Sequence, residues 1–101
     1  MNKALRYNKN KLQWALVDFD SLQPLVQVLE FGCQKYAKDN WKLGLDKTEI
    51  LESLQRHLIE LFKGEQLDEE SKLKHIGHVM ANAMFYSYFQ LKEEKDKVNE
   101  G

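Results

Sequence analysis

The strongest constraint on this chain is a long run of residues without formal charge. No Asp, Glu, Lys or Arg occurs from 75 to 91, although charged residues make up 31% of the sequence. A helix through this run is apolar on two opposite sides, and such a helix has to be covered on both sides. The run also contains His, Asn and Gln and is shorter than the roughly 20 apolar residues of a spanning helix, so we expect it to be buried in protein. One side carries Leu73, Ile76, Met80, Met84 and Leu91, and the other carries Phe85, Tyr86 and Phe89.

The remaining pattern predicts an all-α domain, built as a three-helix unit with an extended N-terminal arm. Leu12, Trp14 and Leu16 alternate with other residues, which favours an extended segment packed on one face. We therefore expect residues 1–20 to form the arm and residues 21–92 to form the helical core. Residues 93–101 are so highly charged that we expect a frayed tail.

Boundary signals divide the core into three helices. Ser21 is a good N-cap for a first helix that ends near Tyr36, because a proline in the first turn is tolerated. Asp46 followed by Glu49 has the spacing of a capping box and opens a second helix, which Gly64 ends. Residue 71, a serine, is expected to cap the third and longest helix, which reaches about residue 92.

The number of helices and the charge balance indicate which partners the chain can have. Two short helices can hardly cover both sides of the third, so we expect a homo-oligomer, a dimer or higher, arranged as a helical bundle. The 15 basic and 16 acidic residues nearly balance, which argues against a nucleic acid polymer or a membrane as partner.

The single cysteine, Cys33, lies in an apolar stripe and is predicted to be a core residue of a cytoplasmic protein.

Three polar residues interrupt the uncharged run at positions that share one helix face. His75, His78 and Asn82 stand at i, i+3 and i+7. Two neutral histidines could simply hydrogen-bond each other or the backbone, and this is one interpretation. The other interpretation is a metal or phosphate site. It is favoured by His57 on the second helix, which lies three residues after Leu54 and four before Leu61 and should therefore face inward with them. Histidine together with carboxylate suits Mn, Zn, Fe or Ni.

Other polar groups have two interpretations each. Arg56 and Glu60 could form a surface ion pair, or the arginine could clamp a phosphate. The residues of segment 64–71 could form a solvated acidic turn or supply carboxylates to a metal. Segment 30–44 combines a lysine, aromatic side chains and an amide, which fits either a core with a loop or a nucleotide pocket. Its members are Lys35, Tyr36, Asn40 and Trp41.

Taken together, five segments resemble one small phage- and prophage-associated family, named for the dATP/dGTP diphosphohydrolase N-terminal domain. They read RYNKNKLQW, LVDFDSLQPLVQVLEFGCQKYAKDNWKLGL, SLQRHL, GEQLDEES and KHIGHVMANAMF, and the resemblance runs from about Leu5 to Tyr88. It implies an all-α relative of the MazG-like enzymes that cleave a nucleoside triphosphate to the monophosphate and pyrophosphate. The chain departs from the pattern in two ways. The acidic EExxE motif is absent, and Lys72 stands where the family has glycine.

The resemblance implies a metal-dependent (deoxy)nucleoside triphosphate pyrophosphohydrolase in the cytoplasm, or in the host cytoplasm for a phage protein. The expected cofactor is a divalent metal, Mn or Mg first, with Zn, Fe and Ni as alternatives. The ligand is a nucleotide of the dATP/dGTP class or a signalling nucleotide. The rival hypothesis is an oligomeric binder that sequesters such a nucleotide without cleaving it. The resemblance and the residue pattern together lead us to expect catalysis by Arg56, Lys35 and Glu60, substrate binding by Tyr36, Asn40, Trp41, Asp68 and Asn82, and metal binding by His57, Glu65, His75 and His78. Of these, Glu60 and Asn82 rest on the residue pattern alone.

Overall fold

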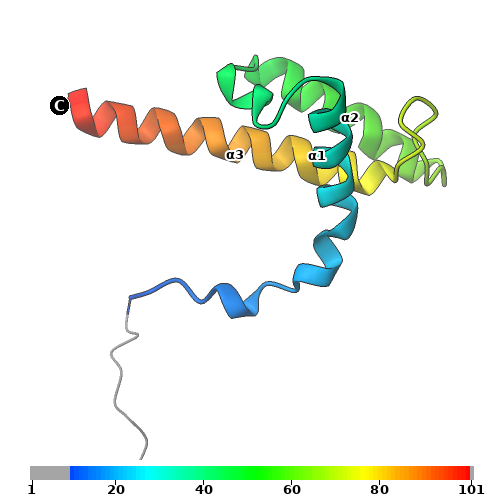
Figure 1. Ribbon diagram of the computed structural model, residues 1–101, viewed down its shortest axis with the longest axis horizontal. Helices are drawn as coiled ribbons and strands as arrows, with labels where there is room; N and C mark the ends of the chain where they lie inside the picture. The colour runs from blue at the N-terminus through cyan, green and yellow to red at the C-terminus, as the bar shows by residue number, and fades with distance from the viewer. Residues whose placement is uncertain (1–9, 101) are drawn as a thin grey trace, which may run out of the picture.

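The computed structural model describes residues 10–100, and this part of the chain is all-α as predicted. Its helices are α1 (Gln23–Lys35), α2 (Lys47–Phe62) and α3 (His75–Glu100), joined by the short 3₁₀ helices η1 (Trp14–Leu16), η2 (Phe19–Leu22) and η3 (Asn40–Leu43). Figure 1 shows α3 as a long rod, with α2 beside it and α1 crossing its N-terminal part. Both shorter helices pack mainly on α3. None of the helices among residues 10–100 is long and apolar enough to cross a membrane.

The ends of α2 follow the predicted signals. The Asp46 carboxylate accepts a hydrogen bond from the Glu49 backbone N–H at 3.1 Å, which confirms the cap. Gly64 has a φ of +88°, the left-handed conformation in which glycine commonly ends a helix.

The other helix boundaries differ from the predicted ones. The 3₁₀ turn Phe19–Leu22 precedes α1, so this helix begins after Ser21. Residues 66–75 form a tight loop closed by an antiparallel bridge between Leu67 and Lys74, and α3 therefore begins only at His75. At its other end α3 stays helical past residue 92 to Glu100. The tail consists largely of good helix formers, and an ion pair of 2.9 Å joins Glu93 to Lys47 of α2.

Residues 1–9 of the predicted arm lie outside the described part of the chain, and residues 10–20 depart from the expectation of an extended, packed segment. Residues 14–16 form a 3₁₀ turn, in which the Val17 N–H donates to the Trp14 carbonyl at 3.0 Å. Leu12 and Leu16 are each 80% exposed, and Figure 1 shows the described part of the arm reaching away from the helices. Alternation over three residues is a weak signal, and local backbone hydrogen bonds outweigh it here.

Few apolar side chains are fully enclosed. Within the described chain only Ile50 of α2 and Ala81 of α3 belong to the buried apolar class, together with the polar His75. Cys33 is exposed, which overturns its prediction as a core residue: α1 meets α3 through the Pro24 and Val28 side, and the thiol lies on the wall of a cleft instead.

Glycine at position 77 allows α1 to cross α3 at close range. A Cβ atom added to Gly77 would lie 2.3 Å from the Pro24 carbonyl oxygen and 3.0 Å from a methyl group of Val28. The first of these atoms is backbone and cannot rotate away. Any other residue at position 77 would therefore force the start of α1 to move away from α3.

We predict that Gly77→Ala lowers the free energy of unfolding by about 1–3 kcal/mol, because the added methyl group overpacks the crossing. Gly32→Ala is the matched control, since a Cβ there meets nothing within 4 Å. In the α1 helix that change removes glycine's entropic cost and should stabilise the protein by up to about 1 kcal/mol. Urea denaturation measures both. Equal stability of Gly77→Ala and the parent chain would contradict the close crossing.

Candidate functional site

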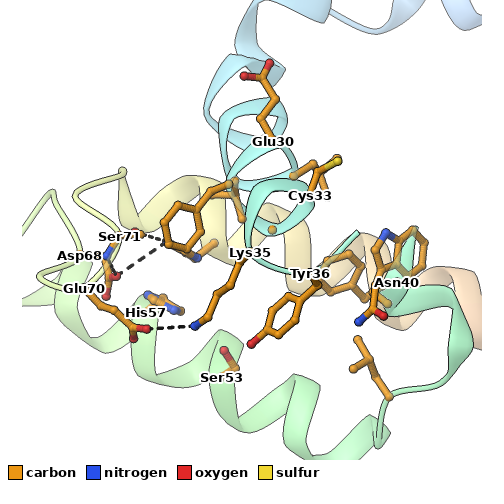
Figure 2. Close-up of a pocket in the computed structure, with 18 of the residues that line it drawn as sticks. Glu30, Cys33, Lys35, Tyr36, Asn40, Ser53, His57, Asp68, Glu70 and Ser71 are labelled. Atoms are coloured by element: carbon orange, nitrogen blue, oxygen red, sulfur yellow. Dashed lines mark hydrogen bonds and ion pairs between the residues drawn. The ribbon is translucent and has the colours of Figure 1, made fainter. Parts of the chain in front are cut away.

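A cleft of about 1150 Å³ lies between α1, the segment that follows it, and α2. Figure 2 shows Lys35 and Tyr36 extending from the end of α1 toward α2, where Ser53 and His57 lie. The start of α3 and the loop before it close one end of the cleft. This space exists because α1 and α2 both pack on α3 and leave a gap between their own side chains.

Three histidines meet at that closed end. The Nδ1 atoms of His57 and His75 are 2.8 Å apart, so one ring donates its hydrogen to the other. The rings of His57 and His78 are stacked, with centroids 4.3 Å apart and planes inclined by 7°. Of the three, His75 is buried to 5% exposure, and the others are half-buried. The inward direction predicted for His57 is therefore confirmed.

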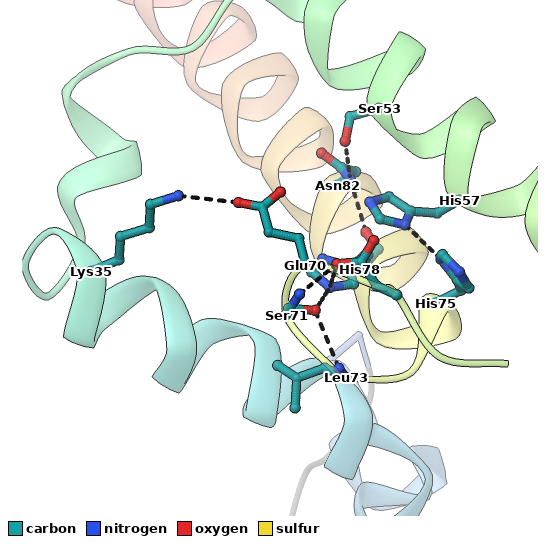
Figure 3. A network of polar contacts seen from close by, with 10 residues as sticks. Lys35, Ser53, His57, Glu70, Ser71, Leu73, His75, His78 and Asn82 are labelled. Atoms are coloured by element: carbon teal, nitrogen blue, oxygen red, sulfur yellow. Dashed lines mark hydrogen bonds and ion pairs between the residues drawn. The ribbon is translucent and has the colours of Figure 1, made fainter.

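The loop before α3 places a carboxylate beside these rings. Asp68 accepts the Ser71 backbone N–H at 2.8 Å, and its own backbone N–H donates to the Leu73 carbonyl at 2.8 Å. The Ser71 hydroxyl lies 2.8 Å from His78 Nε2. Figure 3 shows Ser71 and His78 next to each other at the start of α3. The Asp68 carboxylate is 3.9 Å from the same nitrogen. The loop is thus held by its own backbone and by His78.

The surroundings keep two of the rings neutral. Burial lowers the pKa of His57, and the neighbouring His78 acts in the same direction. Burial likewise lowers the pKa of His78, although the Asp68 carboxylate opposes this. Burial raises the pKa of Asp68, but the hydrogen bonds from Ser71 outweigh it and leave this pKa below its ordinary value. At neutral pH the site therefore combines uncharged His57 and His78 rings with an ionised Asp68 carboxylate.

These groups have the chemistry of a divalent metal site. One ligand atom from each of His57, Asp68 and His75 can be chosen so that all three lie within 4.8 Å of one another. They come from α2, the loop and α3, and two nitrogen donors with one oxygen donor suit a transition metal. Sequence reasoning placed Asp68 with the substrate and Glu65 with the metal. Glu65 is not among the residues that line the cleft.

Most of the predicted site residues line this one cleft. The exceptions are Glu65 and Asn82. The Asn82 amide donates to the Ser53 hydroxyl at 3.2 Å and to the His78 carbonyl at 2.9 Å, so it joins α3 to α2. The residues that the structure brings together are Lys35, Tyr36, Asn40, Trp41, Arg56, His57, Glu60, Asp68, His75 and His78.

The charged residues on the walls differ in their partners. The surface ion pair between Arg56 and Glu60 is not formed, because Glu60 lies 3.4 Å from Lys63 instead. Arg56 has no ion pair among residues 10–100 and lies on the cleft wall. Lys35 reaches across the cleft mouth to Glu70 at 3.5 Å.

The two aromatic candidates have different surroundings. Trp41 is half-buried and packs against Phe85 and Tyr88 of α3, with ring centroids 4.6 and 4.9 Å away. It therefore anchors η3 to α3, which agrees with the core interpretation. Tyr36 is 66% exposed at the cleft wall. Of these two rings, Tyr36 has the more open surface.

Sequence reasoning did not single out several of the lining residues as site residues. Ser53 stands four positions before His57, so helical spacing alone could have placed it on the same face. Glu70 and Ser71 reach the site through the fold of the loop, which no periodicity reveals. Glu30 and Cys33 lie one turn apart on α1, and no pattern in the sequence marks them.

Lys72 has a left-handed backbone, with a φ of +62°. Its N–H donates to the Asp68 carbonyl at 2.8 Å, which closes the turn next to the carboxylate. A residue with a side chain is strained in this conformation, and glycine is not. The glycine that the resembling family carries at this position suits this turn.

The fold and the cluster define the chain as an all-α protein with a histidine–carboxylate site beside an open cleft. The profile of the family described as "dATP/dGTP diphosphohydrolase, N-terminal" matches residues 1–98, and the chain belongs to that family. It is also 32% identical over 82 residues to the protein named dATP/dGTP diphosphohydrolase of Salmonella phage PMBT28. The match covers 81% of this chain and 28% of that relative. No solved structure matches the chain.

The lowered histidine pKa values predict a pH-dependent stability. In metal-free buffer, the unfolded chain binds more protons than the folded one once the pH falls below the ordinary histidine value of 6.5. The free energy of unfolding should therefore be unaffected by these groups above that pH and fall progressively below it. Denaturation at about pH 7.5 and about pH 5.5 with a chelator measures the change.

His78→Gln should flatten this dependence, because it removes one of the two groups, while Lys92→Gln on the far part of α3 should leave it unchanged. A parent chain with equal stability at both pH values would contradict the shifted histidines.

We further predict that Lys72→Gly raises the free energy of unfolding by about 0.5–1 kcal/mol, because glycine relieves the left-handed strain. Lys74→Gly is the control. Position 74 pairs with Leu67 in the bridge, so glycine there should destabilise the loop. Thermal unfolding in parallel measures both changes, and a loss of stability in Lys72→Gly would refute this account of the turn.

Proposed function

We propose that the cleft binds a (deoxy)nucleoside triphosphate and that the chain hydrolyses it to the monophosphate and pyrophosphate. The observation that carries this proposal is the convergence of His57, Asp68 and His75 at one end of a cleft whose wall carries Arg56 and Lys35. Membership of the diphosphohydrolase N-terminal family and the name of the phage relative support the same reaction class.

A divalent metal fits the residues at the closed end of the cleft. The His57–His75 hydrogen bond uses two Nδ1 atoms. When the donating ring instead carries its hydrogen on Nε2, both Nδ1 atoms are free as nitrogen donors beside the ionised Asp68 carboxylate. This donor set favours Mn, Fe, Zn or Ni over Mg alone, which prefers oxygen ligands. We assign the ligands to His57, Asp68 and His75. When bound, such an ion polarises phosphate oxygens and lowers the pKa of a water molecule.

The protein's own cations hold the phosphate chain. The planar guanidinium group of Arg56 can donate two parallel hydrogen bonds to a phosphate, and no carboxylate among the described residues forms an ion pair with it. Lys35 is held by Glu70 at the cleft mouth, and both side chains are largely exposed, so this weak pair can exchange for a phosphate. The two cations offset the charge that develops on the leaving pyrophosphate.

The reaction consumes one water molecule per nucleotide. Water attacks the α-phosphorus, the bond from that phosphorus to the bridging oxygen breaks, and pyrophosphate leaves with the bonding electrons. The proton of the attacking water goes to a carboxylate on the wall, and we assign this role to Glu60. Tyr36 provides the exposed ring for the base, and Asn40 provides an amide for its edge.

A second pair of groups positions the ligands without touching the substrate. His78 stacks on the His57 ring and lies within hydrogen-bond distance of Ser71, and Asn82 joins the His78 backbone to Ser53. Together they fix the relative positions of α2, α3 and the loop. We therefore assign His78 and Asn82 to positioning, in place of metal and substrate contact.

The proposal predicts release of pyrophosphate when the purified chain is incubated with dATP or dGTP and Mn²⁺. Arg56→Gln should lower kcat/KM by about 10- to 200-fold, which corresponds to the loss of one charge-assisted phosphate contact of roughly 1.5–3 kcal/mol. Lys92→Gln is the matched control, because it removes one positive charge from an exposed position outside the cleft. Its activity should equal that of the parent chain.

The assay should separate pyrophosphate from inorganic phosphate by measuring phosphate with and without added pyrophosphatase. Release of no product across all deoxynucleotides with Mn²⁺, Mg²⁺ or Zn²⁺ would reject hydrolysis by this chain. Nucleotide that stays bound and intact, as seen by mass spectrometry, would instead favour a binder that sequesters its ligand.

A further inference from the structure

The Ser53 hydroxyl lies on the cleft wall one helical turn before His57. Ser53, Arg56 and His57 share one face of α2, because positions i, i+3 and i+4 of a helix lie on the same side. All three residues line the cleft. Figure 2 shows Ser53 pointing from α2 into the cleft, toward the region where the ends of Lys35 and Tyr36 lie. A ligand in the cleft can therefore reach this hydroxyl.

Asn82 of α3 determines how the Ser53 hydroxyl is oriented. The side-chain nitrogen of Asn82 lies 2.9 Å from the His78 carbonyl oxygen and 3.2 Å from Ser53 Oγ. A backbone carbonyl can only accept a hydrogen bond, so the end of the amide that faces it has to be the NH₂ group. That group donates one hydrogen to His78 and the other to Ser53. Ser53 is therefore the acceptor in its bond with Asn82.

The hydrogen of the Ser53 hydroxyl is left to donate elsewhere. A serine hydroxyl carries one hydrogen and two lone pairs, and the bond from Asn82 occupies one lone pair. Within residues 10–100, Asn82 is the sole hydrogen-bond partner of this side chain. A helical serine without a fixed donor commonly bonds the backbone carbonyl one turn earlier. Here the Asn82 amide holds one side of the oxygen, so the hydrogen is directed away from Asn82, and the cleft offers the open space.

We propose that Ser53 donates this hydrogen to a phosphate oxygen of the bound nucleotide, a role that rests on the proposed nucleotide function of the cleft. Phosphate oxygens are acceptors, and a hydrogen bond to a charged oxygen is stronger than one to a neutral group. Arg56 lies on the same face of α2, and Lys35 extends toward α2 from the opposite wall. Ser53 thus adds an uncharged, oriented donor to these two cations.

The position of Ser53 along the cleft suits a phosphate. At 1.5 Å per residue, Ser53 lies about 6 Å along the helix axis from His57, one of the proposed metal ligands. Figure 2 shows Ser53 between His57 and Asn40, the amide assigned to the edge of the base. A nucleotide whose base lies beside Asn40 and whose phosphates reach the metal ligands has to pass Ser53 with its phosphate chain.

Calorimetry with a non-hydrolysable dATP analogue tests the contact. The analogue carries a methylene group between its α- and β-phosphates and is titrated in the presence of Mn²⁺. Ser53→Ala should weaken its binding about 10- to 100-fold, the loss expected for one hydrogen bond to a charged group. Ser53→Thr keeps a hydroxyl and should recover most of the affinity. Ser87→Ala is the matched control, because Ser87 is exposed on α3 outside the cleft, and it should bind like the parent chain.

Deoxyadenosine at millimolar concentration separates the phosphate contact from a structural role. It has the same base and sugar without phosphate, so Ser53→Ala should bind it as the parent chain does. An equal loss for deoxyadenosine and the analogue would show that the hydroxyl acts only by joining α2 to α3, and would overturn the proposal. Undiminished binding of the analogue by Ser53→Ala would overturn it too, while the nucleotide function stands. A parent chain that does not bind the analogue would overturn both.

Discussion

The close approach of α1 to α3 at Gly77 determines where the cleft lies. The Pro24 carbonyl occupies the space that any side chain at 77 would need, so the start of α1 sits directly on the first turn of α3. From that contact α1 runs toward Lys35 and Tyr36, whose side chains then face α2 across the cleft. A wider crossing would carry both side chains away from the histidines. One residue without a side chain thus controls the distance between the phosphate-binding and metal-binding groups that we propose.

The histidine cluster serves two requirements with the same atoms. A buried imidazole needs a hydrogen-bond partner, and His57 and His75 provide each other's. The same pair forms a nitrogen donor set beside Asp68 when the donating ring carries its hydrogen on Nε2 instead of Nδ1. The interpretations of satisfied core histidines and of a ligand set are therefore both compatible with this arrangement. The uncharged His57 ring and the ionised Asp68 carboxylate are in the protonation states that metal binding requires at neutral pH.

Periodicity predicted the parts of the fold that depend on local chemistry. The capping box at Asp46, the stop at Gly64 and the inward direction of His57 all follow from side chains within one or two turns, and the structure has them. Such local signals gave wrong helix boundaries where the structure depends on contacts between residues far apart in the local pattern. The loop before α3 closes by backbone pairing, which moved the helix start from Ser71 to His75 and brought Asp68 to the histidines. Helical spacing contains no information about that closure, so it could not show that Asp68 lies beside the histidines while Glu65 lies outside the cleft.

The central claim is that His57, Asp68 and His75 hold one divalent metal ion at the closed end of the cleft. Anomalous diffraction from crystals grown with Mn²⁺, measured on both sides of the manganese absorption edge, tests it most directly. We predict one anomalous peak per chain, within bonding distance of the two imidazole nitrogens and the Asp68 carboxylate. Peaks only at other carboxylates, or no peak at saturating Mn²⁺, would contradict the claim.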